Sequence, residues 1–97
     1  MYVVRNVFRA KPGQAKALVA KFKAAQPLIE KSTAGQVRLL TDVSAGFWTV
    51  VVENTTDNLN EYLGVAQKVS QEPEIGEAMK GYMDLIESGY REIFKVE

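Results

Sequence analysis

Two segments with apolar residues on both faces of an alternating pattern constrain the fold of this chain most. Residues 2–9 (YVVRNVFR) and 47–53 (FWTVVVE) are rich in β-branched and aromatic residues, which is typical of strands. Because successive side chains of a strand point to opposite faces, neither segment has a purely polar face. Helices of a small chain can cover one face of such a sheet, and a second copy of the chain is the simplest cover for the other.

Helical periodicity between the strands indicates an α+β fold. We expect a single domain over residues 1–97 with the order β-α-β-β-α-β, which is the ferredoxin-like pattern. The predicted four-stranded antiparallel sheet has the order 4-1-3-2, with the helices on one face. The expected elements are strands at 2–9, 36–42, 47–53 and 90–96, a helix from residue 14 that ends within 32–35, and further helices after 54–57, where several side chains can cap, and from residue 73.

Proline and glycine positions refine the helices. Pro27 lacks the amide hydrogen that an intact helix needs, so we expect the first helix to kink or restart there. Pro73 suits the first turn of a helix. Gly89 is a candidate left-handed cap at the end of the last helix.

Composition excludes several kinds of chemistry. The chain has neither cysteine nor histidine, so it lacks thiolate nucleophiles, imidazole acid–base groups and histidine ligands for zinc or haem. No carboxylate spacing suggests a metal site, and we expect no metal and no cofactor. Any catalysis would rely on carboxylates, Lys, Arg, Tyr, hydroxyls, Asn or the substrate itself.

Charge and hydropathy limit the partners. The formal net charge is zero, which gives no electrostatic attraction to nucleic acid or to an anionic membrane. No apolar run approaches the roughly 20 residues that span a bilayer. Met1 leads directly into a predicted strand, so we expect no signal peptide and a cytoplasmic location.

The predicted faces favour a homodimer. We place Trp48, Val50 and Val52 on the open face of the sheet beside Val3 and Val7, where they would form an apolar patch larger than monomers usually expose. Two such sheets packed face to face would bury it, with Trp48 as an anchor. Arg5 and Arg9 share this face and are expected to form ion pairs between subunits, with Glu92 as a candidate partner.

Several short motifs carry a family resemblance. They are Arg5-Asn6, Lys11-Pro12-Gly13, the third strand from Gly46-Phe47-Trp48 to Val52-Glu53-Asn54, the helix Pro73-Glu74-Ile75 to Ala78-Met79, and Ser88-Gly89-Tyr90-Arg91-Glu92-Ile93-Phe94. With these motifs the whole chain resembles the dimeric α+β barrel superfamily, in its antibiotic-biosynthesis-monooxygenase-like and NIPSNAP-like branches. The resemblance implies a dimer and a pocket between the sheet and its own helices. It does not imply one activity, because this scaffold hosts many chemistries.

The resemblance also bears on haem degradation. Asn6 stands at the first-strand position where some haem-degrading and quinone-forming members carry a functional asparagine. The haem-degrading members also need a histidine on the second helix, which this chain lacks. Glu53 stands where they carry a third-strand tryptophan, so haem degradation is disfavoured.

Two polar residues are the catalytic candidates. Asn6 can polarise a substrate carbonyl or hold an oxyanion, or it can be a structural amide. Glu53, predicted on the same side of the sheet as Asn6, can act as a general base, or it can cap a helix or pair with a lysine.

Four further residues are predicted to contact a ligand. Tyr62 and Tyr82 lie on the predicted inner faces of the later helices and can donate hydrogen bonds into a pocket, although such tyrosines are often core residues. Phe8 and Met79 would supply apolar lining.

These observations leave three functions open. We favour a small homodimeric protein that binds a small hydrophobic or aromatic molecule. The first alternative is a cofactor-independent monooxygenase or isomerase for an aromatic polyketide-like substrate, in which Asn6 and either a tyrosine or Glu53 would assist proton transfer. The second is a structural or regulatory dimer with a filled interior, so the sequence alone does not decide whether the chain is an enzyme.

Overall fold

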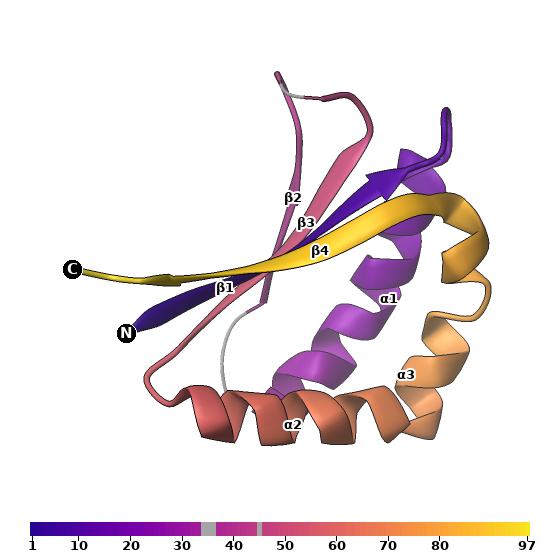
Figure 1. Ribbon diagram of the computed structural model, residues 1–97. Coiled ribbons are helices and arrows are strands. Elements are labelled where there is room, and N and C mark those ends of the chain that lie inside the picture. The colour runs from indigo at the N-terminus through magenta and orange to yellow at the C-terminus, as the bar shows by residue number, and fades with distance from the viewer. Residues whose placement is uncertain (34–36, 45) are drawn as a thin grey trace.

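A four-stranded antiparallel sheet carries all the helices on one side (Figure 1). The computed structural model describes residues 1–33, 37–44 and 46–97. The strand order is β2-β3-β1-β4, which confirms the predicted order and the ferredoxin-like fold. The elements are β1 (Tyr2–Ala10), α1 (Ala15–Thr33), β2 (Val37–Thr41), β3 (Thr49–Thr56), α2 (Leu59–Gln71), α3 (Pro73–Ala78), the 3₁₀ helix η1 (Tyr82–Leu85) and β4 (Ile86–Lys95).

The register between β1 and β3 decides which residues face the helices. Phe8 pairs with Val50, and Asn6 pairs with Val52. Directly opposed residues of an antiparallel pair share a face, so these four side chains lie together. Val50 belongs to the core beneath Leu18 of α1, and Phe8 and Val52 pack against that core. The helix-facing side of the sheet therefore carries the main hydrophobic core.

The predicted face of two interface residues is wrong. Val50 and Val52 lie beneath the helices, and Val50 has no exposed surface, whereas Val3 and Val7 lie on the open face. Alternation along a strand sorts residues into two sets, but the register with the neighbouring strand decides which set faces the core. The predicted stripe of Trp48, Val50 and Val52 beside Val3 therefore does not form.

The turn before β3 also breaks the predicted alternation. Phe47 and Trp48 have φ angles of 59° and 53°, a left-handed conformation that is uncommon for bulky residues. The strand begins only at Thr49. Trp48 therefore lies at the end of the sheet instead of within the strand as predicted.

Gly89 does not have the left-handed conformation predicted for it, whereas Gly81 adopts that conformation. Gly89 lies inside β4, opposite Phe8, and an added Cβ there would come within 3.1 Å of the Phe8 ring at Cδ1. It is therefore not a helix cap as predicted, but a position where the ring needs the space. Gly81, with φ of 80°, is the left-handed residue that separates α3 from η1.

Other boundaries differ by a few residues. Pro27 lies within α1, which is one continuous helix from Ala15 to Thr33, so the helix does not restart there. Pro73 begins α3 as predicted. The predicted helix end at residues 34 and 35 and the predicted strand start at Gln36 lie outside the described residues.

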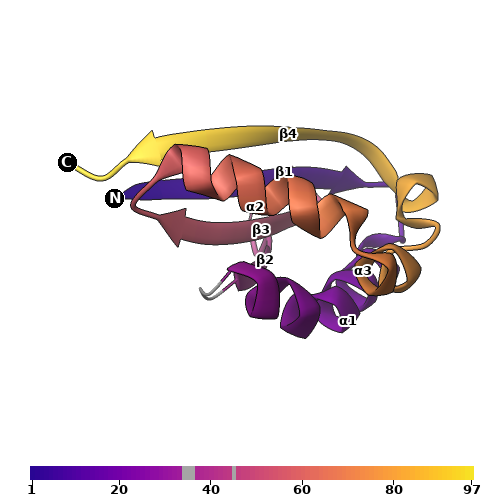
Figure 2. The same cartoon turned by 90° about the horizontal axis from the view of Figure 1, so that it is seen from below.

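The second helix differs from α1 and α3 because none of its residues is fully buried. Its cap is Asn58, just after the predicted 54–57 segment, and the Asn58 side chain accepts a hydrogen bond from the amide of Glu61. α2 packs against α1 and α3 (Figure 2). None of the described helices is long and apolar enough to cross a membrane.

Candidate functional site

A cavity of about 240 Å³ lies between the helix-facing side of the sheet and α2. Its position is the one expected from the resemblance, between the sheet and its own helices. Most of its walls are apolar. The lining residues are Asn6, Phe8, Phe22, Ile29, Val37, Val52, Asn54, Tyr62, Ala66, Val69, Ser70 and Arg91.

One face of α2 forms the outer wall of this cavity. Tyr62, Ala66 and Val69 are spaced by three and four residues, so they share a helix face, and all three are half-buried. Leu63, which follows Tyr62 in the helix, is 47% exposed and does not line the cavity. The apolar stripe of α2 therefore lines a hollow instead of filling it.

A polar pair stands on the opposite wall of the cavity. Arg91 of β4 pairs directly with Asn6 of β1, and its Nε donates a hydrogen bond of 2.7 Å to the Asn6 side-chain oxygen. The guanidinium carbon of Arg91 also lies 5.8 Å from the centre of the Tyr62 ring, a distance suited to a cation–π contact. The structure thus joins the predicted site residues Asn6 and Tyr62 through an arginine that was not among the predicted site residues.

A second hollow of about 430 Å³ adjoins the first. The two hollows share Phe8 and Phe22, and the second is also lined by Met79 and Tyr82. Asn6 and the four predicted ligand-binding residues therefore line two neighbouring hollows on the helix side of the sheet.

Glu53 does not belong to this site. It is the β3 partner of Arg5 on the open face, with its Oε2 3.5 Å from the Arg5 Nε. Its Oε1 accepts a hydrogen bond of 3.1 Å from the Nε of Arg38. The prediction that Glu53 lies on the same side as Asn6 is therefore wrong, because the register places it across the sheet.

Arg5 has a second carboxylate partner within the chain, and Arg9 has one as well. Arg5 Nη1 lies 3.9 Å from a carboxylate oxygen of Glu92, and Arg9 Nε lies 3.6 Å from one of Glu87. The structure thus supplies from the same chain the carboxylates that were expected from a second subunit.

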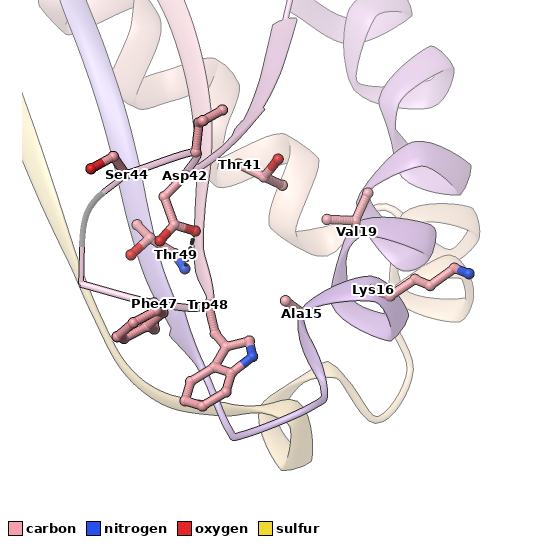
Figure 3. A pocket seen from close by; sticks show the side chains of 10 residues that line it. Ala15, Lys16, Val19, Thr41, Asp42, Ser44, Phe47, Trp48 and Thr49 are labelled. Atoms are coloured by element: carbon pink, nitrogen blue, oxygen red, sulfur yellow. Dashed lines mark hydrogen bonds between the residues drawn. The ribbon is translucent and has the colours of Figure 1, made fainter.

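A larger hollow, of about 580 Å³, lies between the β2–β3 turn and the start of α1 (Figure 3). Asp42 closes the turn by accepting a hydrogen bond of 2.9 Å from the amide of Thr49. Trp48, which is 41% exposed, lines this hollow together with Ala15 at the start of α1. Most of the residues that line this hollow are exposed, whereas most of those around the cavity under α2 are buried or half-buried, so this hollow is the weaker candidate.

Among the described residues, no group of three or more acidic side chains is placed to hold a metal ion. The polar groups of the cavity are amides, hydroxyls and one guanidinium, which suit hydrogen bonding to an organic ligand.

Comparison with solved structures identifies proteins of the same shape. An uncharacterised NIPSNAP domain protein from Burkholderia xenovorans superposes with a TM-score of 0.86 at 13% identity, over 100% of this chain and 95% of that one. A NIPSNAP family protein of unknown function from Agrobacterium tumefaciens gives 0.85 at 18%, over 99% and 87%. This chain shares their fold.

An antibiotic biosynthesis monooxygenase-like protein from Chloroflexus aurantiacus has a TM-score of 0.73 at 15% identity, over 99% of this chain and 92% of that one. No protein-family model matches the chain, and no curated protein matches its sequence. The resemblance expected from the motifs is thereby confirmed at the level of the fold. The identities are too low to transfer a binding residue or an activity.

The sequence reasoning missed Arg91, although its strand was part of the resemblance. The sequence did predict that the first and last strands are neighbours in the sheet, and these strands are antiparallel. To find Arg91, the register of the two strands would also have been needed, because only a pairing of Arg91 with Asn6 brings the two side chains to one face.

Proposed function

We propose that this chain binds a small, mainly apolar or aromatic molecule in the cavity between the sheet and α2. One observation carries the proposal: the apolar walls of the cavity surround a hydrogen-bonded pair, Asn6 and Arg91. Small-molecule sites typically combine apolar walls with a few placed polar groups. The adjoining hollow at Met79 and Tyr82 gives a ligand room to extend.

A neutral bicyclic probe tests this proposal. We expect isothermal titration calorimetry to detect binding of 2-naphthamide. Ala66→Phe should lower the affinity roughly tenfold, because the new ring fills part of the cavity that Ala66 lines. Ala20→Phe is the matched control, since Ala20 is exposed on α1 and does not line the cavity. Equal effects of the two variants, or no binding to the unmodified chain, would contradict the proposal.

We further propose that the open face of the sheet packs against a second copy of the chain. Tyr90 and Phe94 of β4 pair with Val7 and Val3, so their side chains lie on this face, where they are 60% and 51% exposed. Large exposed aromatic residues on an uncovered sheet face are typical of an interface.

The dimer is tested by sedimentation at micromolar concentration. The unmodified chain should sediment as a dimer, and Tyr90→Asp with Phe94→Asp should convert it to a monomer. Met83→Asp is the control, because Met83 is 63% exposed but belongs to η1. A monomeric unmodified chain would overturn the proposed interface.

The geometry removes Glu53 from the monooxygenase or isomerase alternative, and it leaves Asn6 and Tyr62 beside the cavity. A substrate in the cavity has the sheet between itself and that carboxylate, so Glu53 cannot serve it as a general base. A cytoplasmic location stays a prediction.

A further inference from the structure

The arginines of this chain all lie in strands, but one differs from the others in its partners. Three are paired with carboxylates on the open face: Arg5 with Glu53 and Glu92, Arg9 with Glu87, and Arg38 with Glu53. Arg91 lies on the helix-facing side, and within the described part of the chain it makes no ion pair. No carboxylate of the described residues therefore neutralises its charge.

Two neutral groups hold the Arg91 guanidinium in place. Asn6 accepts the hydrogen bond from Nε, and the Tyr62 ring lies 5.8 Å from the guanidinium carbon. Across the described residues, neither terminal Nη group of Arg91 takes part in a hydrogen bond or ion pair. A guanidinium fixed along its Nε edge presents these two groups as a fork that matches the two oxygens of a carboxylate.

Arg91 faces a cavity whose described lining is otherwise uncharged. It is the one charged side chain among the described residues that line the cavity. The neighbouring carboxylate on β4, Glu92, lies on the open face beside Arg5. One positive charge thus stands at the edge of an otherwise neutral, mainly apolar hollow.

We propose that Arg91, held by Asn6 and Tyr62, binds the carboxylate of a small apolar acid whose body occupies the cavity. This inference rests on the proposed function, and it adds the chemical class of the ligand. Asn6 is then a positioning residue for Arg91. It accepts the hydrogen bond from the guanidinium through its side-chain oxygen, whereas the role predicted from the sequence used the side-chain amide group as a donor.

Two probes with the same ring and different charge test the inference. We expect 2-naphthoate to bind roughly fivefold more tightly than 2-naphthamide at low salt, a modest factor because Arg91 is exposed to solvent. Arg91→Gln should remove this preference by weakening only the naphthoate. Arg91→Lys keeps the charge without the fork, so it should retain part of the preference, and it provides a second variant if Arg91→Gln fails to fold.

Arg38→Gln is the matched control, because Arg38 lies on the open face, and the preference should survive it. Equal binding of the two probes, or a preference that survives Arg91→Gln, would overturn the inference while 2-naphthamide binding still supports the proposed function. Binding of neither probe would overturn both.

Discussion

The two faces of the sheet use the same residue types differently. On the open face, Glu53 is only 14% exposed and joins Arg5 to Arg38, so charges there neutralise one another. On the helix-facing side, Arg91 meets an amide and an aromatic ring instead of a carboxylate. An arginine with carboxylate partners holds strands together, whereas one with neutral partners keeps its charge for a ligand.

The faces also differ in how their apolar residues are covered. Leu18 and Val50 are fully buried between α1 and the sheet. On the open face, Val7 and Val51 are 8% and 7% exposed although no helix covers them. Arg5 and Arg9 flank Val7 on that face, and long charged side chains can cover apolar surface with their methylene stems. The open face is therefore less apolar than the predicted stripe of valines.

The largest expected loss of stability distinguishes a buried residue of α1 from an exposed residue of α2. Leu18→Ala should lower the free energy of unfolding by about 3 kcal/mol, because it leaves a cavity in the core. Leu63→Ala, at a position 47% exposed on α2, should cost less than about 1 kcal/mol. Urea denaturation measures both. Equal losses would mean that α1 is not the main cover of the sheet.

The next largest loss of stability tests the close contact between Gly89 of β4 and the Phe8 ring of β1. Gly89→Ala should cost about 1–2 kcal/mol, because the added Cβ meets the Phe8 ring. Gly64→Ala in α2 is the control, where the Cβ meets nothing and helix propensity should give a gain of up to about 1 kcal/mol.

A double-mutant cycle sharpens this test. Phe8→Leu should recover part of the loss caused by Gly89→Ala if the ring is its cause. Thermal unfolding that shows stabilisation by both glycine substitutions would contradict the contact.

The smallest expected loss of stability tests the ion pairs of Glu53 on the open face. Glu53→Gln should lower stability by about 1 kcal/mol, because Arg5 and Arg38 lose a shared partner, and the loss should shrink at high salt. The affinity for 2-naphthamide should not change, since Glu53 lies across the sheet from the cavity. A weakened affinity with unchanged stability would place Glu53 in the binding site instead.

The order of elements and of strands was predictable from the sequence, whereas the faces of β3 were not. Periodicity and turn residues identify strands and helices, and helical crossovers limit the strand orders. The position of Val50 depends on its register against Phe8, which a single sequence does not reveal. The left-handed backbone at Trp48 added to the error, because an aromatic residue gives no sign of it.

The candidate site was predictable as a place but not as a set of contacts. Asn6, Phe8 and Tyr62 were named from their faces, and the structure brings them to one cavity. The hydrogen bond between Asn6 and Arg91 joins residues 85 positions apart, so it exists only once β1 and β4 are in register. Gly89 was misread for the same reason, because its close neighbour Phe8 lies on another strand.

Because none of the α2 residues is fully buried, moving α2 away from the sheet exposes less apolar surface than moving α1, which buries Leu18 and Phe22. Such a local opening needs far less free energy than global unfolding, so amide hydrogens of α2 should exchange with solvent sooner than those of β1, which is bonded to a strand on each side. Since α2 forms the outer wall of the cavity, a ligand can enter while the sheet stays intact. The rate of association would then follow the opening of this helix and not the stability of the whole domain.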